Sequence, residues 1–168
     1  MACLNSYRKN CYGPSTPCPV VCCSCTNCCE NLVQNPPTST TNIAFFTLST
    51  PTIVVIDSIV PVTLVFNAGT AIASPSVGNV VLATGTYEVS YNVTSVLGED
   101  GTNSFGILLG GVVVPASIGS ASGEAGDIVS ISNSVILSVD SSTALTLNNL
   151  GDDTVTINVA NLTIRKIN

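Results

Sequence analysis

From residue 43 onward, hydrophobic and polar side chains alternate in short segments, which is the pattern of β-strands. The clearest segment is Thr86 to Val96, where Tyr87, Val89 and Tyr91 alternate with polar residues. This period of two places the apolar side chains on one face of a strand and the polar side chains on the other. We therefore predict a half-buried strand whose two tyrosines lie in the core.

Similar segments recur about every ten residues, separated by turns of Gly, Asn and Asp. They are predicted as strands at 43–48, 53–56, 60–66, 79–83, 104–109, 112–115, 128–139, 144–147 and 154–167. Gly110-Gly111 is suited to a two-residue hairpin turn. We expect a Gly- and Ser-rich loop at 119–126 and a bulge or bend near Asn133.

No segment has the period of a helix, so the pattern predicts an all-β fold, an antiparallel sandwich. Jelly-roll and immunoglobulin-like topologies both fit this pattern. The chain has no Trp, and its 8 cysteines all lie before residue 30, so the usual immunoglobulin core marker is missing.

The first thirty residues have a different composition, with Cys and Pro in place of aliphatic periodicity. Pro14, Pro17 and Pro19 break helices, and Pro36-Pro37 gives the next segment the character of an extended spacer. We therefore divide the chain into a Cys-rich arm at 1–30, a linker at 31–42 and a β-domain at 43–168.

The cysteines of the arm are spaced C-x3-C-C-x-C-x2-C-C in their densest part. Such spacing allows a thiolate metal cluster, oxidative cross-links or free thiols. A disulfide between adjacent residues is strained, so the pairs Cys22-Cys23 and Cys28-Cys29 favour links to other chains. We predict no metal or cofactor, and we take all the cysteines as candidates for intermolecular disulfides: Cys3, Cys11, Cys18, Cys22, Cys23, Cys25, Cys28 and Cys29.

Charge is scarce in this chain. Only 8% of residues are charged, against about a quarter in a typical soluble domain, and so apolar a surface predicts a body partly buried in an assembly.

The longest nearly apolar run, Phe105 to Ala116, is too short and too rich in Gly to span a membrane. The net charge is −6 and the four basic residues lie near the chain ends, which argues against nucleic-acid binding. The N-terminus lacks the apolar core of a signal peptide.

Enzymatic chemistry has little support. There is no histidine to activate a Ser or Cys nucleophile. The carboxylate pairs Glu99-Asp100 and Asp152-Asp153 lie in turn-like sequence, where solvated carboxylates are expected, and no calcium-loop motif surrounds the second pair. Asn92 and Asn161 each begin an N-x-T pattern, which we interpret as a chance match inside strands.

The β-domain resembles the C1q/tumour-necrosis-factor-like jelly rolls of bacterial endospore surfaces. The segment from Thr84 to Val93 is similar to the G-x-Y-x-x-S-Y core strand of that family. Three further segments lie where the family has strands: 104–109 before its Gly turn, 133–139 and 155–164. The resemblance implies a homotrimer with apolar subunit contacts, located at the spore surface, in the exosporium, the coat or their appendages, and made in the mother-cell cytoplasm.

The arm departs from this family, because the filament heads carry a collagen-like stalk and this chain has none. A Cys-rich arm before a jelly roll is similar to endospore appendage subunits, whose connectors bond to cysteines in a neighbouring body. Here residues 30–168 contain no cysteine, so any disulfide must join arm to arm or arm to another Cys-rich spore-surface protein.

Three functions remain open at this point. The first is a structural, self-assembling subunit of a spore-surface layer or fibre, cross-linked through its arm. The second is a C1q-like binding head anchored by the arm, with the loops at 98–103 and 119–126 as its candidate site. The third is a thiolate metal-binding protein.

Overall fold

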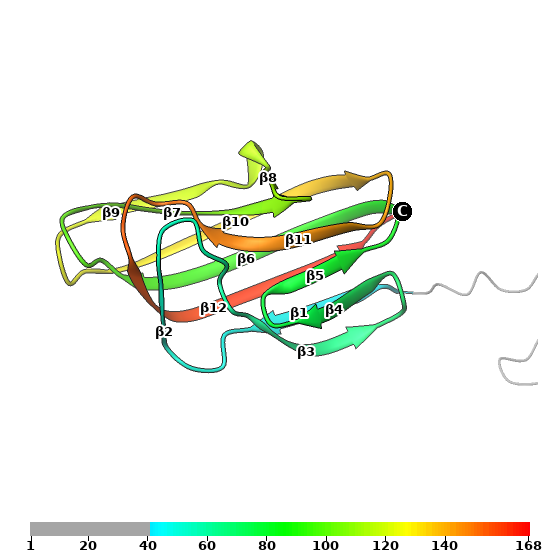
Figure 1. The fold of residues 1–168 in the computed structure, drawn as a ribbon, viewed down its shortest axis with the longest axis horizontal. Helices are drawn as coiled ribbons and strands as arrows, with labels where there is room; N and C mark the ends of the chain where they lie inside the picture. The colour runs from blue at the N-terminus through cyan, green and yellow to red at the C-terminus, as the bar shows by residue number, and fades with distance from the viewer. Residues whose placement is uncertain (1–40) are drawn as a thin grey trace, which may run out of the picture. The chain divides into compact units, whose positions relative to one another are not determined.

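The structure is a computed structural model that describes residues 41–168. In this part of the chain, two antiparallel six-stranded sheets face each other in a sandwich (Figure 1). Sheet A consists of β10 (Ile128–Val139), β6 (Gly85–Val96), β12 (Val155–Lys166), β1 (Ile43–Thr47) and β3 (Thr63–Ala68) in spatial order, with β2 (Thr52–Val54) beside β12. Sheet B consists of β4 (Ile72–Ser76), β5 (Asn79–Leu82), β11 (Thr143–Asn149), β7 (Gly101–Leu109) and β8 (Val112–Val113), with β9 (Gly119–Gly123) also beside β7.

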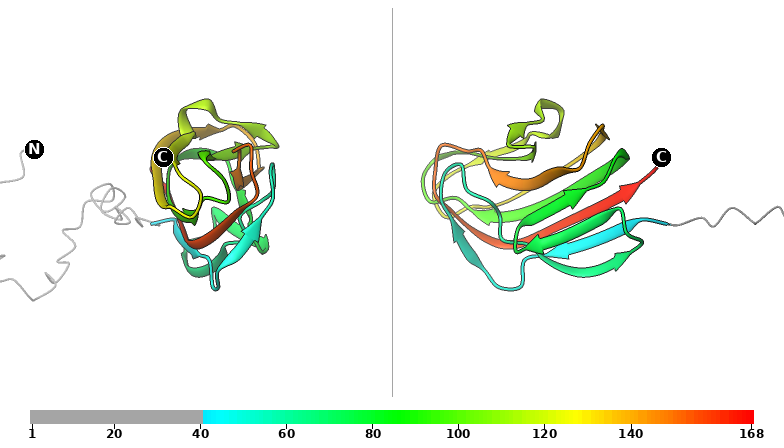
Figure 2. Two further views of the ribbon diagram at one scale, coloured as in Figure 1. Left: turned by 90° about the vertical axis from the view of Figure 1, so that its left-hand side faces the viewer. Right: turned by 45° about the vertical axis from the view of Figure 1, so that its right-hand side comes forward.

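The predicted all-β antiparallel sandwich is confirmed, and the two further views show its two layers (Figure 2). The one helical element among the described residues is a short 3-10 turn, η1 (Pro115–Ser117). No helix in residues 41–168 is long and apolar enough to cross a membrane. The predicted domain start at Ile43 coincides with the first residue of β1.

The core lies between the sheets and takes every second side chain of their strands. In β6 the predicted alternation holds over the whole strand, so that Tyr87, Val89, Tyr91 and Val93 are buried. The largest fully buried side chains are Phe46, Val60, Ile72, Leu82, Tyr87, Phe105, Ile107, Leu145, Leu147, Ile157, Leu162 and Ile164.

The hairpin predicted at Gly110-Gly111 is present between β7 and β8. Both glycines have positive φ, 59° and 81°, a conformation that side-chain-bearing residues avoid and that a type I′ turn requires. The sequence therefore marked this turn correctly, because its chemistry is local.

The loop predicted at 119–126 is wrong in its first part, because residues 119–123 form β9 and pair with β7. Small hydroxyl side chains stabilise this pairing. The hydroxyl oxygens of Ser104 and Ser120 lie 2.8 Å apart, and those of Thr102 and Ser122 lie 2.6 Å apart. Gly119 is required by packing, since a Cβ there would lie 2.8 Å from Ile131 Cγ2. The small Gly and Ser residues here allow β9 to pack closely against its neighbours.

The β-bulge predicted as one possibility near Asn133 is absent, because β10 pairs with β6 in unbroken register from Ile128 to Val139. Asn133 instead donates hydrogen bonds from Nδ2 to the carbonyl oxygens of Ala116 and Ile118, at 3.2 and 3.0 Å. Its amide thus ties the edge strand β10 to η1 and to the residue that precedes β9. Irregular pairing occurs elsewhere, in β12 between Ile157 and Val159 and in the β1–β3 pair.

Tyr91 connects the two sheets through its hydroxyl. The oxygen lies 2.8 Å from the carbonyl oxygens of both Phe105 and Ser117, and it accepts a hydrogen bond from the backbone N–H of Gly119. Burial raises the pKa of Tyr91 to about 12, although the Gly119 N–H lowers it in part. The hydroxyl therefore holds β6, β7 and η1 together in its neutral form.

We predict that Tyr91→Phe lowers the free energy of unfolding at pH 7 by about 1–3 kcal/mol, because buried backbone groups lose their partner. In the parent, the raised pKa of Tyr91 contributes stability that is complete below pH 10 and is lost as the pH rises from 10 to about 12, since only the unfolded state ionises readily there. Urea unfolding at several pH values measures both effects. The variant should lose less stability than the parent over that interval, and an equal loss would contradict this role of Tyr91.

Candidate self-association face

The side of sheet A that faces away from sheet B carries an unusual distribution of side chains, and we name it the outer face of sheet A. In β6 it receives the residues that alternate with the core positions, from Glu88 through Asn92 to Val96. The strand registers place these residues in rows with the neighbouring strands, so the composition of each row follows from the pairing.

The middle rows of the outer face are polar and uncharged. Asn92 lies directly opposite Asn161 of β12 on one side and Ser132 of β10 on the other. Thr47 of β1 completes this row, and its hydroxyl lies 3.0 Å from Asn161 Oδ1. The next row contains Ser90 between Thr163 and Ser134 and, with the first, borders a shallow depression lined by Ser90, Tyr91, Asn92, Asn161 and Thr163.

Apolar side chains flank these polar rows at one end of the face and at its two edge strands. At one end, Ile53 of β2, Thr156 of β12, Val96 of β6 and Ile128 of β10 form a row, in which both isoleucines are 69% exposed. Two isoleucine side chains exposed to water do not stabilise a monomer, so their exposure is typical of a contact surface.

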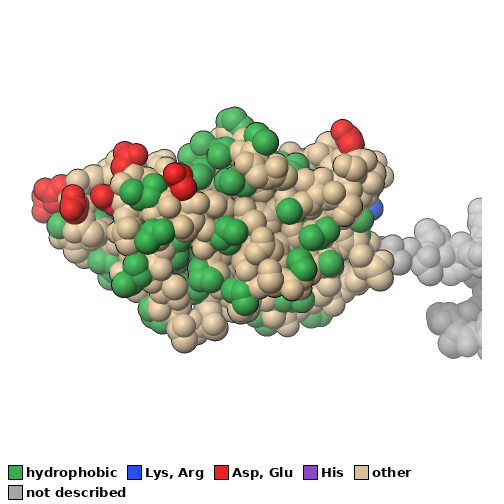
Figure 3. All heavy atoms as spheres, viewed as in Figure 1, with side chains coloured by type: hydrophobic (Ala, Val, Ile, Leu, Met, Phe, Trp, Pro, Cys, Tyr) green, Lys and Arg blue, Asp and Glu red, His purple; other side chains and the backbone are tan. Residues whose placement is uncertain are grey.

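At the β3 edge of the sheet, Phe66 lies opposite Phe45 of β1, in the same row as Thr163 and Ser90, and it is 53% exposed. Across the sheet, Ile136 of β10 is 65% exposed. A further apolar group lies on β8 and directly after η1, where Val112 and Ile118 are exposed, and Figure 3 shows green side chains gathered over β8. The opposite edges of the body thus carry different apolar patches.

Charge is nearly absent from the outer face. Arg165 and Glu88 lie opposite each other in it, 2.5 Å apart between Nη2 and Oε2, and form the one ion pair among residues 41–168. Both side chains are well exposed, so this pair adds at most about 1 kcal/mol to stability. Its chief effect is to neutralise the two charges that the face contains.

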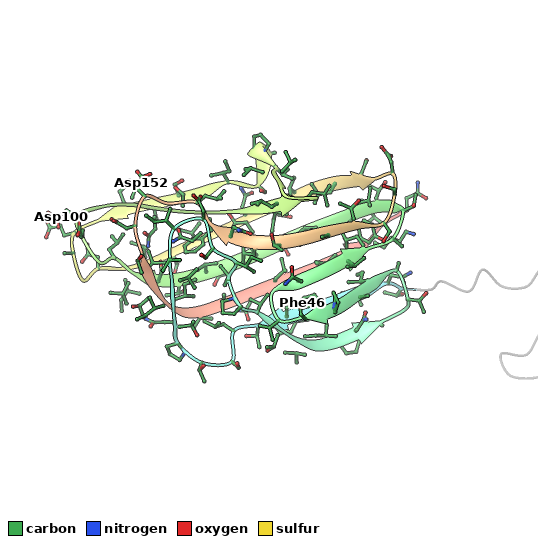
Figure 4. The ribbon with its side chains drawn as sticks, viewed as in Figure 1. Phe46, Asp100 and Asp152 are labelled. Atoms are coloured by element: carbon green, nitrogen blue, oxygen red, sulfur yellow. The ribbon has the colours of Figure 1, made fainter. Side chains whose placement is uncertain are left out.

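Most carboxylates lie instead at one end of the body, in the turns β6–β7, β9–β10 and β11–β12 (Figures 3 and 4). This acidic end consists of Glu99, Asp100, Glu124, Asp127, Asp152 and Asp153. Both carboxylate pairs that the sequence marked lie here, in turns, as predicted. Asp100 Oδ1 accepts a hydrogen bond from the Ala125 N–H at 2.8 Å, and no group of three or more potential metal ligands occurs in residues 41–168.

The arm at 1–30, with all of its candidate disulfide residues, and the linker up to residue 40 lie outside the described residues, so the predicted cross-links stay a prediction. Asn92 and Asn161 are the residues that sequence reasoning undervalued. Strand alternation placed Asn92 on a polar face, whereas Asn161 reaches that face only because the register of β12 shifts between Ile157 and Val159. Only the pairing of β6 with β12 then brings the two residues together. That pairing joins segments about seventy residues apart and has no local signal.

Neither a family model nor a curated protein sequence matches this chain. Solved structures do match it in fold. Murine APRIL is 12% identical, with a TM-score of 0.63 over 76% of this chain and 99% of its own. The Eiger TNF of S. frugiperda is 14% identical, with a TM-score of 0.62 over 77% and 94%.

The globular domain of the zebrafish complement 1qA protein is 9% identical, with a TM-score of 0.62 over 76% of this chain and 98% of its own. At these identities the likeness concerns the fold alone. The described part of the chain is a jelly roll of the tumour-necrosis-factor and C1q type.

Proposed function

We propose that this chain is a structural, self-assembling subunit of an endospore surface layer or fibre. Its body associates with further copies through the outer face of sheet A, and its arm joins neighbouring copies, or other Cys-rich spore-surface proteins, by disulfides. The observation that carries the proposal is the outer face itself, which combines exposed apolar side chains with almost no charge.

The placement of the apolar patches supports a closed ring of copies. One edge of the body exposes Phe66, and the opposite edge exposes Ile136 with Val112 and Ile118. Contact between two different patches is heterologous, and such contacts generate a ring where the rotation between copies closes. A trimer agrees with the jelly-roll fold and with the endospore family that the chain resembles.

The separation of thiols from the body supports a cross-linking arm. Residues 30–168 contain no cysteine, so oxidation of the arm leaves the chemistry of the sandwich unchanged. A covalently joined assembly comes apart only after several separate events, and its resistance is therefore kinetic. The spore-surface location rests on the sequence resemblance.

The alternative of a binding head would use the acidic end, where the turns containing Glu99 and Glu124 meet. That surface is strongly negative, whereas the outer face of sheet A is apolar and polar without net charge. The two functions therefore require different surfaces of the body. Self-association needs the outer face, and a binding head needs the acidic end.

We expect replacement of Cys22, Cys23, Cys28 and Cys29 by serine to leave the body folded and to make assemblies that detergent and heat disperse. The reason is that the remaining contacts are non-covalent. Negative-stain electron microscopy before and after heating in detergent, with circular dichroism for the fold, measures this. A variant as resistant as the parent would rule out the cross-link. Discrete particles from the parent, with and without reductant, would favour the binding head.

Phe66→Glu should weaken association of the full chain about 100-fold or more under strong reductant. A carboxylate buried in the contact costs several kcal/mol, and each 1.4 kcal/mol changes the dissociation constant tenfold. Sedimentation velocity over a concentration series provides the measurement. Val77→Glu is the matched control, because Val77 is similarly exposed, at 56%, but lies in the β4–β5 turn of sheet B. Equal effects of the two changes would remove the outer face from the contact.

A further inference from the structure

We infer that the Asn92–Asn161 pair determines which arrangement of copies forms on the outer face of sheet A. The inference rests on the proposed function and deepens it. The apolar patches supply affinity, and the two amides at the centre of the face supply selection among possible arrangements.

The hydrogen bonds of the pair are incomplete within residues 41–168. Asn161 Oδ1 accepts from the Thr47 hydroxyl at 3.0 Å, but its Nδ2 has no partner among the described residues. The Asn92 side chain makes no hydrogen bond to any residue of the described sandwich, although its neighbours leave it only partly exposed. The adjacent row differs, since the hydroxyls of Thr94 and Ser130 lie 3.0 Å apart and satisfy each other.

Water satisfies these amides in a single copy, and association removes that water. A buried amide that finds no new partner costs about 1–3 kcal/mol, and the cost recurs in every copy of the assembly. Arrangements that leave the amides unpaired are therefore disfavoured, whereas apolar patches tolerate small rotations and shifts. Single buried asparagines fix register and oligomer state in coiled coils for the same reason.

A second copy of this chain is the occupant that fits these amides. Each side-chain amide has both donors and an acceptor, so in a closed ring, where equivalent faces surround one axis, the amides of neighbouring copies are complementary to each other. The face repels no second copy, because its two charges neutralise each other in the Arg165–Glu88 pair. The polar centre is also continuous with exposed apolar side chains, with Phe66 at the β3 edge and with Ile53 and Ile128 at one end of the face.

The test replaces both amides by leucine, a side chain of similar size, in Asn92→Leu/Asn161→Leu. Native mass spectrometry of the full chain under strong reductant measures the distribution of oligomers. The parent should give one oligomer, and the variant should still associate but populate two or more oligomeric species. Its thermal midpoint should not fall, because Thr47 keeps a second acceptor in the Ala160 carbonyl oxygen at 3.3 Å.

Thr94→Val is the matched control. It adds apolar surface to the same face but removes a hydroxyl that already has a partner, so we expect the oligomer distribution of the parent. Asn92→Ala provides the same readout without added bulk and serves if the double variant fails to fold, as judged by circular dichroism.

The outcomes distinguish a failure of the proposed function from a failure of the role of the amides. A parent chain that is monomeric at every concentration would overturn the proposed function. A parent with one oligomer and a leucine variant with the same single oligomer would overturn the role of the amides and leave the proposed function intact. A monomeric leucine variant would also overturn it, since the amides would then supply affinity.

Discussion

The pairing of β6 along its whole length, with β10 on one side and β12 on the other, is the constraint on which the rest of this molecule depends. Because successive side chains of a strand point to opposite faces, one sequence of twelve residues sets two surfaces at once. Tyr87, Val89 and Tyr91 build the core, while Ser90 and Asn92 build the centre of the outer face. A shift of one residue in this register would exchange the two sets and lose both.

The sandwich separates three physical roles among different regions. The interior provides stability, the outer face of sheet A is low in charge, and the turns of one end collect the carboxylates. The overall net charge of −6 is therefore compatible with close association of copies, since repulsion acts at the ends rather than across the face. The scarcity of charged residues in the composition is thus concentrated on the outer face of sheet A, where it permits close contact between copies.

Local chemistry made much of the fold predictable from the sequence. The period of two identified β6, and the bounds of β10 agree with the predicted segment 128–139. Gly110-Gly111 identified its turn. The strand β9 was missed because Gly and Ser suggest a loop, and only contact with Ile131 and Tyr91 explains why a small residue is needed at Gly119. The outer face was missed because its rows depend on which strands become neighbours, which is a non-local property.

The positions of the chain ends have a consequence of their own. Both Asn42 and Asn168 hydrogen-bond near the last residues of β12 and the start of β6, so the described chain enters and leaves at one end of the sandwich. The acidic turns lie at the other end, far from these connections. Exposed turns of this kind accept inserted peptides without disturbing the strands they join. The body therefore has the layout of a display scaffold, with both ends of the described chain at one pole and the acidic turns at the other.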